Sequence, residues 1–464
     1  MEDNIKLLAG IKASLDAVSP VELGVNKHSE IVRLLYEICK RENIPVAAVL
    51  GSIGIEGMIK GGKGGFFRKL KSSLMARRYH QGRAGKDTHL MPVVLEAEET
   101  RDCGWNGRLD PFRIFIEKDA EGMPLSARIV RSFPKARVSI VRNLPEALKI
   151  CGRPGAKDAY PMRMDNVFIV TAKAGLIKKC PCSPKCVGCG YLVLNMGFGC
   201  PMGCDYCYLK AYTDIPGILF PANVDDFLEE LSVLDRKAGP CTRIGTGEFT
   251  DSLALDRYTL YSEALIPFFA GLKNLVLELK TKRADIDTVL CQVPNRNVVL
   301  SWSLNTADMS ALYEKGASTL DERLHAAGKA AEKGFDIGFH FDPLIFHKGW
   351  EESYADLVSK VFSVPSVREK CRWVSLGTLR YSPGLKEAFE KDRPDLSAYY
   401  EGEFFTDLDG KLRYDKSLRS MMYRHMAGCI ADSGVNAAVY LCMETEEAWR
   451  ASGLKAGQMF GSAV

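Results

Sequence analysis

The sequence lacks any hydrophobic run long enough to cross a bilayer, and it has no low-complexity segment. Its N-terminus is acidic and amphipathic rather than basic and then apolar, so nothing predicts a secretory signal. The formal net charge of the 464 residues is only +4, which excludes a strong overall attraction to nucleic acid or to an anionic membrane. These absences predict a cytoplasmic globular protein with no membrane partner, and the length favours two domains over one.

Cysteine, by contrast, is abundant and unevenly distributed. Seven of the 15 cysteines fall between Cys180 and Cys207, while the others are scattered, as small buried residues usually are. Disulfides are unusual in a reducing compartment, so the crowding indicates metal binding rather than a disulfide framework.

The segment GFGCPMGCDYCYL places Cys200, Cys204 and Cys207 on one loop with C-x3-C-x2-C spacing. A structural zinc requires four ligands, whereas three thiolates on a [4Fe–4S] cluster leave one iron open for the amino and carboxylate groups of S-adenosylmethionine (SAM). The reduced cluster then cleaves SAM to a 5′-deoxyadenosyl radical that abstracts hydrogen from the substrate. Tyr206 and Tyr208 flank the last ligand, where a ring can shield the cluster or lie against adenine. The alternatives are an incomplete zinc knuckle and core cysteines that meet by coincidence.

A second group of four thiols precedes this loop in the segment KCPCSPKCVGCG. It consists of Cys180, Cys182, Cys186 and Cys189. Four thiols can saturate a metal, so the group predicts a second site that holds an auxiliary iron–sulfur cluster or a structural zinc. Buried or redox-active free thiols are the alternative.

Short apolar strands alternate with helices from residue 190 onward, which is typical of βαβ units and a parallel sheet. We therefore predict an α/β fold with a full or partial TIM-type β/α barrel over residues 190–464. Residues 131–189 supply lead-in strands and the cysteine-rich segment, and residues 1–130 form an α+β accessory region. The apolar pattern predicts a short buried strand over residues 44–52 within that region, and antiparallel strands over residues 112–141 that continue past its end.

In a parallel barrel the reactive groups lie at the carboxyl ends of the strands, and the polar residues of this chain follow that order. They are the cysteine triad after the first barrel strand, Gly247 and Glu248 after the second, Lys282 after the third, Ser303 and Asn305 at the fourth, and His340 and Asp342 at the end of the fifth. His340 and Asp342 are two residues apart on a strand and so share one face. They can bind substrate or transfer a proton, or they form a hydrogen-bonded pair that stiffens the strand end.

Six segments together resemble the spore photoproduct lyase family within the radical SAM superfamily, over about residues 131–444. They are CPMGCDYCYL at Cys200, RIGTGEFTDSLALD at Arg243, SWSLNT at Ser301, EKGASTLDERLHAA at Glu314, GFHFDPLIFHKGWEESY at Gly338 and VYLCMETEEAW at Val439. The resemblance implies a partial (β/α)6 barrel, a [4Fe–4S] cluster, SAM, a reductant such as flavodoxin or ferredoxin, and a lyase activity in DNA repair. It also implies that Thr250, Lys282 and Ser303 surround the methionyl end of SAM.

The chain departs from this family at the position where a cysteine returns a hydrogen atom to the product radical, because the aligned residue here is Glu248. A carboxylate O–H is too strong to donate a hydrogen atom. The segment GTGE, with Gly245 and Gly247, is instead similar to the glycine-rich segment of other radical SAM enzymes, whose backbone and carboxylate receive the SAM ammonium. Cys442, late in the last predicted strand, is the best-placed substitute donor.

Two alternatives to DNA repair follow from these residues. The first keeps the radical chemistry and changes the substrate to a peptide, a tRNA or a small metabolite, because of Glu248, His340 and Asp342. The second is a non-catalytic iron–sulfur or zinc protein that binds nucleic acid through residues 60–86, where lysines and arginines alternate with aromatic residues. A solvated surface is the plainer interpretation of that basic segment.

Overall fold

The computed structural model describes residues 2–60, 65–79, 105, 107–152, 159–183, 185–407 and 409–455. Its contacts divide the chain into two compact units. The smaller unit comprises Met1–Thr100, Ile345–Lys348 and Leu379–Leu418, and the larger comprises Arg101–Leu344, Gly349–Thr378 and Arg419–Val464. The predicted boundaries at residues 130 and 189 stay predictions. The contacts begin the larger unit at Arg101 and assign a late segment of the chain to the smaller unit.

The smaller unit is mainly helical. Its elements are α1 (Glu2–Val18), α2 (Val25–Glu42), α3 (Val46–Ser52), α4 (Ile55–Lys60), α5 (Phe66–Arg78), α18 (Pro383–Asp392) and a small antiparallel sheet of β12 (Arg380–Tyr381), β14 (Leu412–Tyr414) and β13 (Phe404–Thr406). In α2 the fully buried residues Ile31, Leu34, Leu35 and Ile38 recur at helical spacing and form the core. The predicted strand over residues 44–52 is wrong, because α3 occupies it. A short apolar run does not distinguish strand from helix, and here two alanines favour the helix.

A four-stranded sheet opens the larger unit. Its strands are β1 (Arg113–Glu117), β2 (Arg137–Val141), β3 (Asn166–Val170) and β6 (Ile218–Pro221), in the order β2-β1-β3-β6 and all parallel. The prediction of antiparallel strands over residues 112–141 is wrong. The middle segment forms helix α6 (Pro124–Ser132), which begins with a proline and buries Leu125 and Ile129, four residues apart. Because α6 crosses over between β1 and β2, the two strands run parallel.

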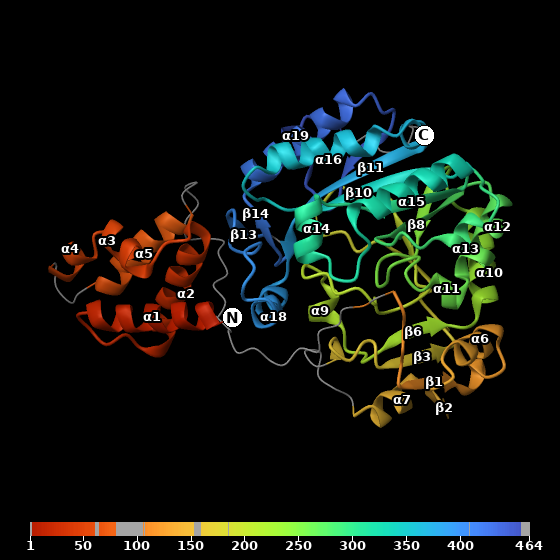
Figure 1. Cartoon of the computed structure of the whole chain (residues 1–464), viewed down its shortest axis with the longest axis horizontal. Helices are drawn as coiled ribbons and strands as arrows, with labels where there is room; N and C mark the ends of the chain where they lie inside the picture. Colours follow the sequence, from red (N-terminus) through yellow and green to blue (C-terminus); the bar gives the residue numbers. More distant parts are fainter. Residues whose placement is uncertain are drawn as a thin grey trace. The chain divides into compact units, whose positions relative to one another are not determined.

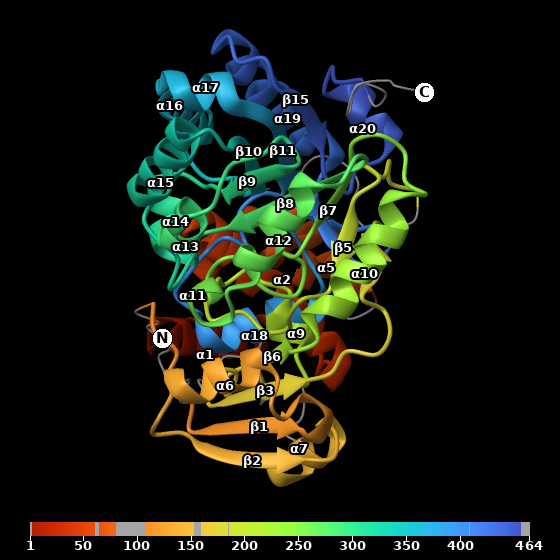
Figure 2. The same cartoon turned by 90° about the vertical axis from the view of Figure 1, so that its right-hand side faces the viewer.

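The second sheet of the larger unit is the predicted partial barrel (Figure 2). Its order is β15-β11-β10-β9-β8-β7-β5-β4, formed by β4 (Ile177–Lys179), β5 (Leu192–Leu194), β7 (Thr242–Gly245), β8 (Leu275–Thr281), β9 (Val298–Ser303), β10 (Asp336–Leu344), β11 (Cys371–Thr378) and β15 (Ala438–Leu441). Neighbouring strands are parallel except at the edge pair β4 and β5. The α/β class and the partial (β/α)6 barrel are therefore confirmed, with β5 and β7 to β11 as its six strands.

Helices connect the barrel strands and cover the outer face of the sheet (Figure 1). The helices not yet named are α7 (Leu144–Ile150) beside the first sheet, α9 (Leu209–Tyr212), α10 (Val224–Asp235), α11 (Asp256–Thr259), α12 (Tyr261–Ala270), α13 (Asp287–Leu290), α14 (Ala307–Tyr313), α15 (Leu320–Lys333), α16 (Trp350–Phe362), α17 (Pro365–Lys370), α19 (Lys416–Asp432) and, after the last strand, α20 (Glu446–Ala451). Helix α15 begins with a capping box between Thr319 and Glu322 and ends at Gly334, whose φ is 108°. These local signals define where the helix before β10 begins and ends.

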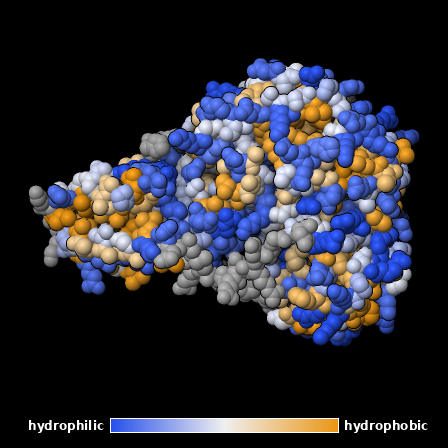
Figure 3. Space-filling view, in the orientation of Figure 1, coloured by the Kyte–Doolittle hydropathy of each residue, from blue (hydrophilic) through white to orange (hydrophobic). Residues whose placement is uncertain are grey.

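Hydrophilic residues cover most of the visible surface of the larger unit in Figure 3, with hydrophobic residues interspersed. Among the described residues, no helix combines the length and the apolar character that a membrane span requires.

Candidate active site

The loop that carries Cys200, Cys204 and Cys207 leaves the carboxyl end of β5 and is held by its main chain. The Gly203 N–H donates to the Lys315 carbonyl over 2.8 Å, and the Asp205 N–H donates to the Tyr313 carbonyl over 2.8 Å. On the other side, the Gly199 N–H donates to the Phe249 carbonyl over 3.0 Å. Gly199 has a φ of 94°, and a Cβ there would lie 3.0 Å from the Gly217 carbonyl oxygen, so the turn requires glycine.

Arg163, which precedes β3, binds three carbonyl groups of this loop. Its guanidinium donates to the Cys200 carbonyl over 3.1 Å and to the Pro201 and Met202 carbonyls over 3.4 Å. The guanidinium also lies 4.2 Å from the centre of the Tyr160 ring, and the Tyr160 hydroxyl donates to the Met202 carbonyl. One cation therefore orders the backbone that presents the thiols.

The three thiols share one buried environment. Burial raises the pKa of each of them, that of Cys204 to about 12, and the Cys207 thiol further raises the pKa of Cys200 and Cys204. Without a metal they carry protons at neutral pH, so metal binding must release these protons. Within the described residues, no group of three or more His, Cys, Asp or Glu side chains stands at ligand distances around a common point. Three thiols on one anchored loop, none of them in a disulfide, nevertheless fit a cluster with three protein ligands.

Glu314, at the end of α14, connects this loop to the end of β8. The Lys282 ammonium lies 2.9 Å from one carboxylate oxygen, to which the Tyr206 hydroxyl also donates. Arg323 and the Ser310 hydroxyl donate to the other oxygen. Burial alone would raise the pKa of Glu314, but the charges of Lys282 and Arg323 outweigh it and lower the pKa to about 2. Glu314 is therefore a buried carboxylate anion that positions Tyr206 and Lys282.

The segment after β7 lies beside the third cysteine. The Tyr208 hydroxyl donates to the Glu248 carbonyl over 2.5 Å, and the Tyr208 ring makes an edge contact with Phe249. The Glu248 carboxylate forms an ion pair with the Lys178 ammonium at 3.1 Å and is only 15% exposed. The Lys178 ammonium also lies 4.0 Å from the centre of the Phe249 ring. Glu248 thus already has a cationic partner from the edge strand β4.

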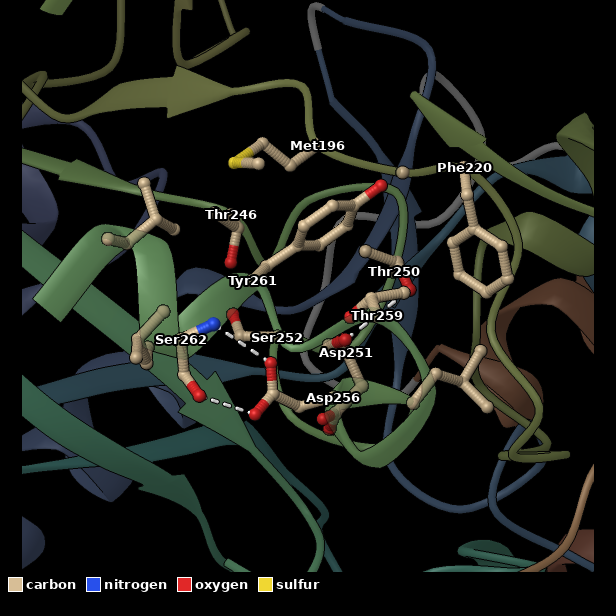
Figure 4. A pocket seen from close by; sticks show the side chains of 14 residues that line it. Met196, Phe220, Thr246, Thr250, Asp251, Ser252, Asp256, Thr259, Tyr261 and Ser262 are labelled. Carbon is tan, nitrogen blue, oxygen red and sulfur yellow. Dashed lines mark hydrogen bonds between the residues drawn. The ribbon is translucent and has the colours of Figure 1, made fainter. Parts of the chain in front are cut away.

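A small pocket opens beside the start of the cysteine loop (Figure 4). Its lining residues are Met196, Gly197, Phe220, Thr246, Thr250, Asp251, Ser252, Leu255, Asp256, Thr259, Tyr261, Ser262, Leu265 and Leu279. The Asp251 carboxylate ties the segment after β7 to the end of β8, because it accepts from the Thr281 hydroxyl over 2.7 Å and from the Lys282 N–H over 2.8 Å. The buried Thr246 hydroxyl has no hydrogen-bond partner among the described residues. The Thr250 hydroxyl has one long contact, at 3.3 Å to the Asp251 carbonyl.

Several predicted SAM contacts have structural partners in this fold. The Asn305 amide donates to the Pro343 carbonyl over 3.0 Å and accepts from the Tyr354 hydroxyl over 2.8 Å. Ser303 is buried at the end of β9, and its carbonyl accepts from Arg323. Gly245 has no room for a side chain, because a Cβ would overlap the Tyr191 hydroxyl.

Gly247 is less tightly packed, with Ser252 and Lys280 at 3.2 and 3.3 Å from a Cβ placed there. Both glycines therefore serve close backbone packing around the end of β7.

His340 lies within β10 rather than at its end, and its side chain points into the barrel. Its Nε2 lies 2.8 Å from Glu278 on β8, so the carboxylate placed against His340 is Glu278. Burial lowers the pKa of His340. Glu278 also accepts from Ser301 over 2.6 Å and Trp373 over 2.7 Å, and pairs with Arg243 at 3.2 Å. Charge and hydrogen bonds thus tie five strands together across the barrel interior.

Asp342 lies nearer the end of β10, and its carboxylate packs over β11. A Cβ at Gly377 would lie 2.7 to 2.8 Å from the carboxylate atoms of Asp342. Cys442 directly follows β15, and its N–H donates to the Leu376 carbonyl over 2.8 Å. Both residues are therefore at the carboxyl ends of their strands, as predicted.

The predicted basic segment over residues 60–86 belongs to the smaller unit, and residues 61–64 and 80–86 lie outside the described residues. Two of its arginines have internal partners. Arg78 is fully buried against Glu37, and Arg77 pairs with Glu42 at 2.6 Å. Arg68 and Lys69, on α5, remain as candidate phosphate contacts.

Comparison with known proteins decides the family. The family model of spore photoproduct lyase matches residues 109–397, more than half of the chain. The chain belongs to the spore photoproduct lyase family. The lyase of Clostridium acetobutylicum is 26% identical over 251 residues, which cover 53% of this chain and 73% of the relative. The lyase of Bacillus subtilis is 25% identical over 288 residues, which cover 61% and 82%.

Solved structures of spore photoproduct lyase share the fold of this chain. A spore photoproduct lyase mutant with bound AdoMet and dinucleoside spore photoproduct superposes with a TM-score of 0.62 at 21% identity, covering 72% of this chain and 100% of that chain. A spore photoproduct lyase complexed with dinucleoside spore photoproduct gives a TM-score of 0.62 over 72% and 99%. As a member of the spore photoproduct lyase family, the chain is an enzyme of the radical SAM lyase type, and the predicted resemblance is confirmed.

Sequence reasoning missed several residues that shape the site of this family member. They are Arg163, Asp251, Glu278, Glu314 and Arg323. For Glu278 a signal was present, because a charged residue inside the otherwise apolar strand LVLELKT must find buried partners. Glu314 and Arg323 both lie in the quoted segment EKGASTLDERLHAA, but nothing local indicates that they face Lys282.

Proposed function

We propose that this chain binds a [4Fe–4S] cluster through Cys200, Cys204 and Cys207 and uses it to cleave SAM reductively. The observation that carries the proposal is the cysteine loop, whose three thiols follow the first barrel strand on a backbone anchored from both sides. When bound and reduced, such a cluster supplies the electron that cleaves SAM to a 5′-deoxyadenosyl radical. A flavodoxin or ferredoxin is the proposed electron donor.

The chain's own residues would hold SAM beside the loop. The Lys282 ammonium is 14% exposed and fixed by Glu314, so it is suited to a carboxylate ligand at the barrel mouth. The hydroxyls of Thr250 and Thr246 line the pocket next to Cys200 and have hydrogen-bonding capacity to spare. Ser303 completes the proposed set at the neighbouring strand end.

The remaining predicted residues have narrower proposed roles. Tyr206 is held by Glu314 and shields the cysteine loop, while Tyr208 is 39% exposed and can lie against adenine. Gly245 and Gly247 let the backbone approach closely, and Asn305 orders the end of β9. Glu248 can receive a SAM ammonium only if it shares its carboxylate with Lys178.

DNA that carries spore photoproduct is the first candidate substrate, because the relatives are named for that reaction and three solved structures hold its dinucleoside. A second candidate is a peptide, tRNA or small metabolite, and it depends on the predicted alignment of Glu248 with the donor cysteine of the family. Under the repair proposal, Cys442 is the substitute hydrogen donor, and His340 with Asp342 contact the substrate.

The test is an anaerobic assay of the reconstituted full chain with dithionite, SAM and dinucleoside spore photoproduct. It scores 5′-deoxyadenosine and repaired thymine dinucleotide separately. We expect both products from the native chain, neither from Cys200→Ala, and unchanged yields from Cys291→Ala, which alters an exposed thiol elsewhere in the larger unit. Deoxyadenosine without repair would overturn the DNA substrate alone. No deoxyadenosine from a chain loaded with iron and sulfide would overturn the radical chemistry and favour the non-catalytic alternative.

A further inference from the structure

Two segments that are distant in the sequence lie side by side at the open edges of the barrel. Residues 180–189 follow the edge strand β4, and residues 442–445 follow the opposite edge strand β15. Cys186 forms an antiparallel bridge with Thr445, and the Val187 N–H donates to the Glu444 carbonyl over 2.8 Å. The backbone therefore brings the cysteine-rich segment against the residues that begin with Cys442.

The thiols of these segments also interact with one another. Cys180 and Cys182 form a tight turn in which the Cys182 N–H donates to the Cys180 carbonyl over 2.8 Å. The Cys180 thiol is hydrogen-bonded with the Cys182 side chain and lies near the thiols of Cys442 and Cys189. The Cys189 thiol is partly buried and also lies near Cys182. Cys186 contributes its backbone to the bridge with Thr445.

We propose that Cys180, Cys182, Cys189 and Cys442 form a second metal site with four thiolate ligands. All four side chains are partly buried and free of disulfides, as a ligand set for a soft metal requires. The fourth ligand is Cys442 rather than the Cys186 that the sequence spacing suggests. A metal-bound thiolate has no S–H to donate, so this ligand role replaces the hydrogen-donor role proposed above for Cys442. Four thiolates saturate either one Zn²⁺ or a [4Fe–4S] cluster, so this centre has no open position for SAM. Bound there, the metal would link the β4 edge of the sheet to its β15 edge.

The experiment removes the first site and asks what metal the full chain still binds. The triple variant Cys200→Ala, Cys204→Ala and Cys207→Ala is reconstituted anaerobically with iron and sulfide in one arm and with Zn²⁺ in the other. We expect one centre per chain. Binding of about four iron and four sulfide identifies a cluster, and about one zinc without sulfide identifies a zinc site. No bound metal in both arms overturns the proposal.

Matched single changes in the triple variant assign the ligands. Cys442→Ser should remove the metal, while Cys186→Ser and Cys291→Ser should retain it. The reverse result, in which Cys186→Ser loses the metal and Cys442→Ser keeps it, overturns the role of Cys442. Far-UV circular dichroism checks folding, and Cys182→Ser replaces Cys442→Ser if the latter fails to fold.

The same change in the chain with its triad intact separates this inference from the proposed function. If Cys442→Ser still yields 5′-deoxyadenosine while its metal content is unchanged, the second site is wrong and the radical chemistry stands. If Cys442→Ser loses one centre and retains iron at the triad, the second site is supported whatever the substrate proves to be.

Discussion

Two buried glutamates, one in each unit, have nearly the same surroundings. In the smaller unit Glu37 contacts Arg33, Arg78 and Lys386, at 2.8, 3.0 and 2.5 Å. In the larger unit Glu314 contacts Lys282, Arg323 and the Tyr206 hydroxyl. In both, burial opposes ionisation and the neighbouring cations outweigh it, so the pKa of each carboxyl is lowered.

The two glutamates differ in where their partners lie relative to the candidate site. Every partner of Glu37 belongs to the smaller unit, where the cluster joins α2, α5 and α18. The partners of Glu314 include Tyr206, which lies between Cys204 and Cys207 in the sequence, and Lys282, which is proposed to bind SAM. The same electrostatic arrangement is therefore structural in one unit and positions the candidate site in the other. Charge and burial alone do not distinguish the two.

The largest expected effect is that of Glu37→Gln. This change leaves Arg33, Arg78 and Lys386 with Glu390 as the remaining carboxylate of the cluster, and should cost about 3–5 kcal/mol of stability in the smaller unit. All five tryptophans lie in the larger unit, so tryptophan fluorescence reports on that unit, whereas far-UV circular dichroism reports on both. We expect the far-UV dichroism signal to begin to change at a lower guanidinium concentration. The tryptophan fluorescence transition and the iron content should stay unchanged. An equal shift in both signals would contradict the division of roles.

Glu314→Gln should have the complementary effect, at about 3 kcal/mol, because Lys282 and Arg323 lose their shared counter-charge. Here the tryptophan-detected transition should move to lower denaturant concentration, and iron retained after reconstitution should fall. Full iron content in a folded Glu314→Gln chain would show that Glu314 does not position the cysteine loop.

Tyr206→Phe is a smaller perturbation of the same cluster. It removes one hydroxyl donor to a buried carboxylate and should cost about 2 kcal/mol. The matched control is Tyr212→Phe, whose ring is 69% exposed on α9 and should change stability little. Denaturation midpoints followed by tryptophan fluorescence measure both, and equal shifts would mean that the Glu314 contact is not responsible.

The smallest expected effect is a pH dependence in the smaller unit. Burial lowers the pKa of Lys386 to about 8, below its unfolded value near 10.5. Between these two pKa values the unfolded chain binds more protons than the folded chain. The free energy of unfolding should therefore rise with pH from about pH 8, by about 1 kcal/mol over the first pH unit. Lys386→Met should abolish this rise. The unfolding free energy should be measured only up to about pH 9. Burial raises the pKa of Cys39 to about 11, so above pH 9 the ionisation of this thiol in the unfolded chain lowers stability and opposes the effect of Lys386.

Much of the larger unit could be predicted from local patterns. The run NVVLSWSLN becomes β9, in which every residue from Val298 to Ser303 is buried, as expected for a parallel strand covered on both faces. Helix α15, from Leu320 to Lys333, is one of the helices expected to alternate with the apolar strands after residue 190. Prediction failed where the pattern was short or shared by two structures, as in α3 and α6.

The sequence by itself determined the barrel strands and the spacing of the cysteine triad, because both depend on residues that are neighbours in the chain. The tertiary structure decided which distant residues meet. It placed Glu314 against Lys282, Lys386 against Glu37, and Cys442 beside the cysteine-rich segment. Such contacts depend on how helices pack on the sheet and on how the open sheet curves. No local periodicity encodes these distances.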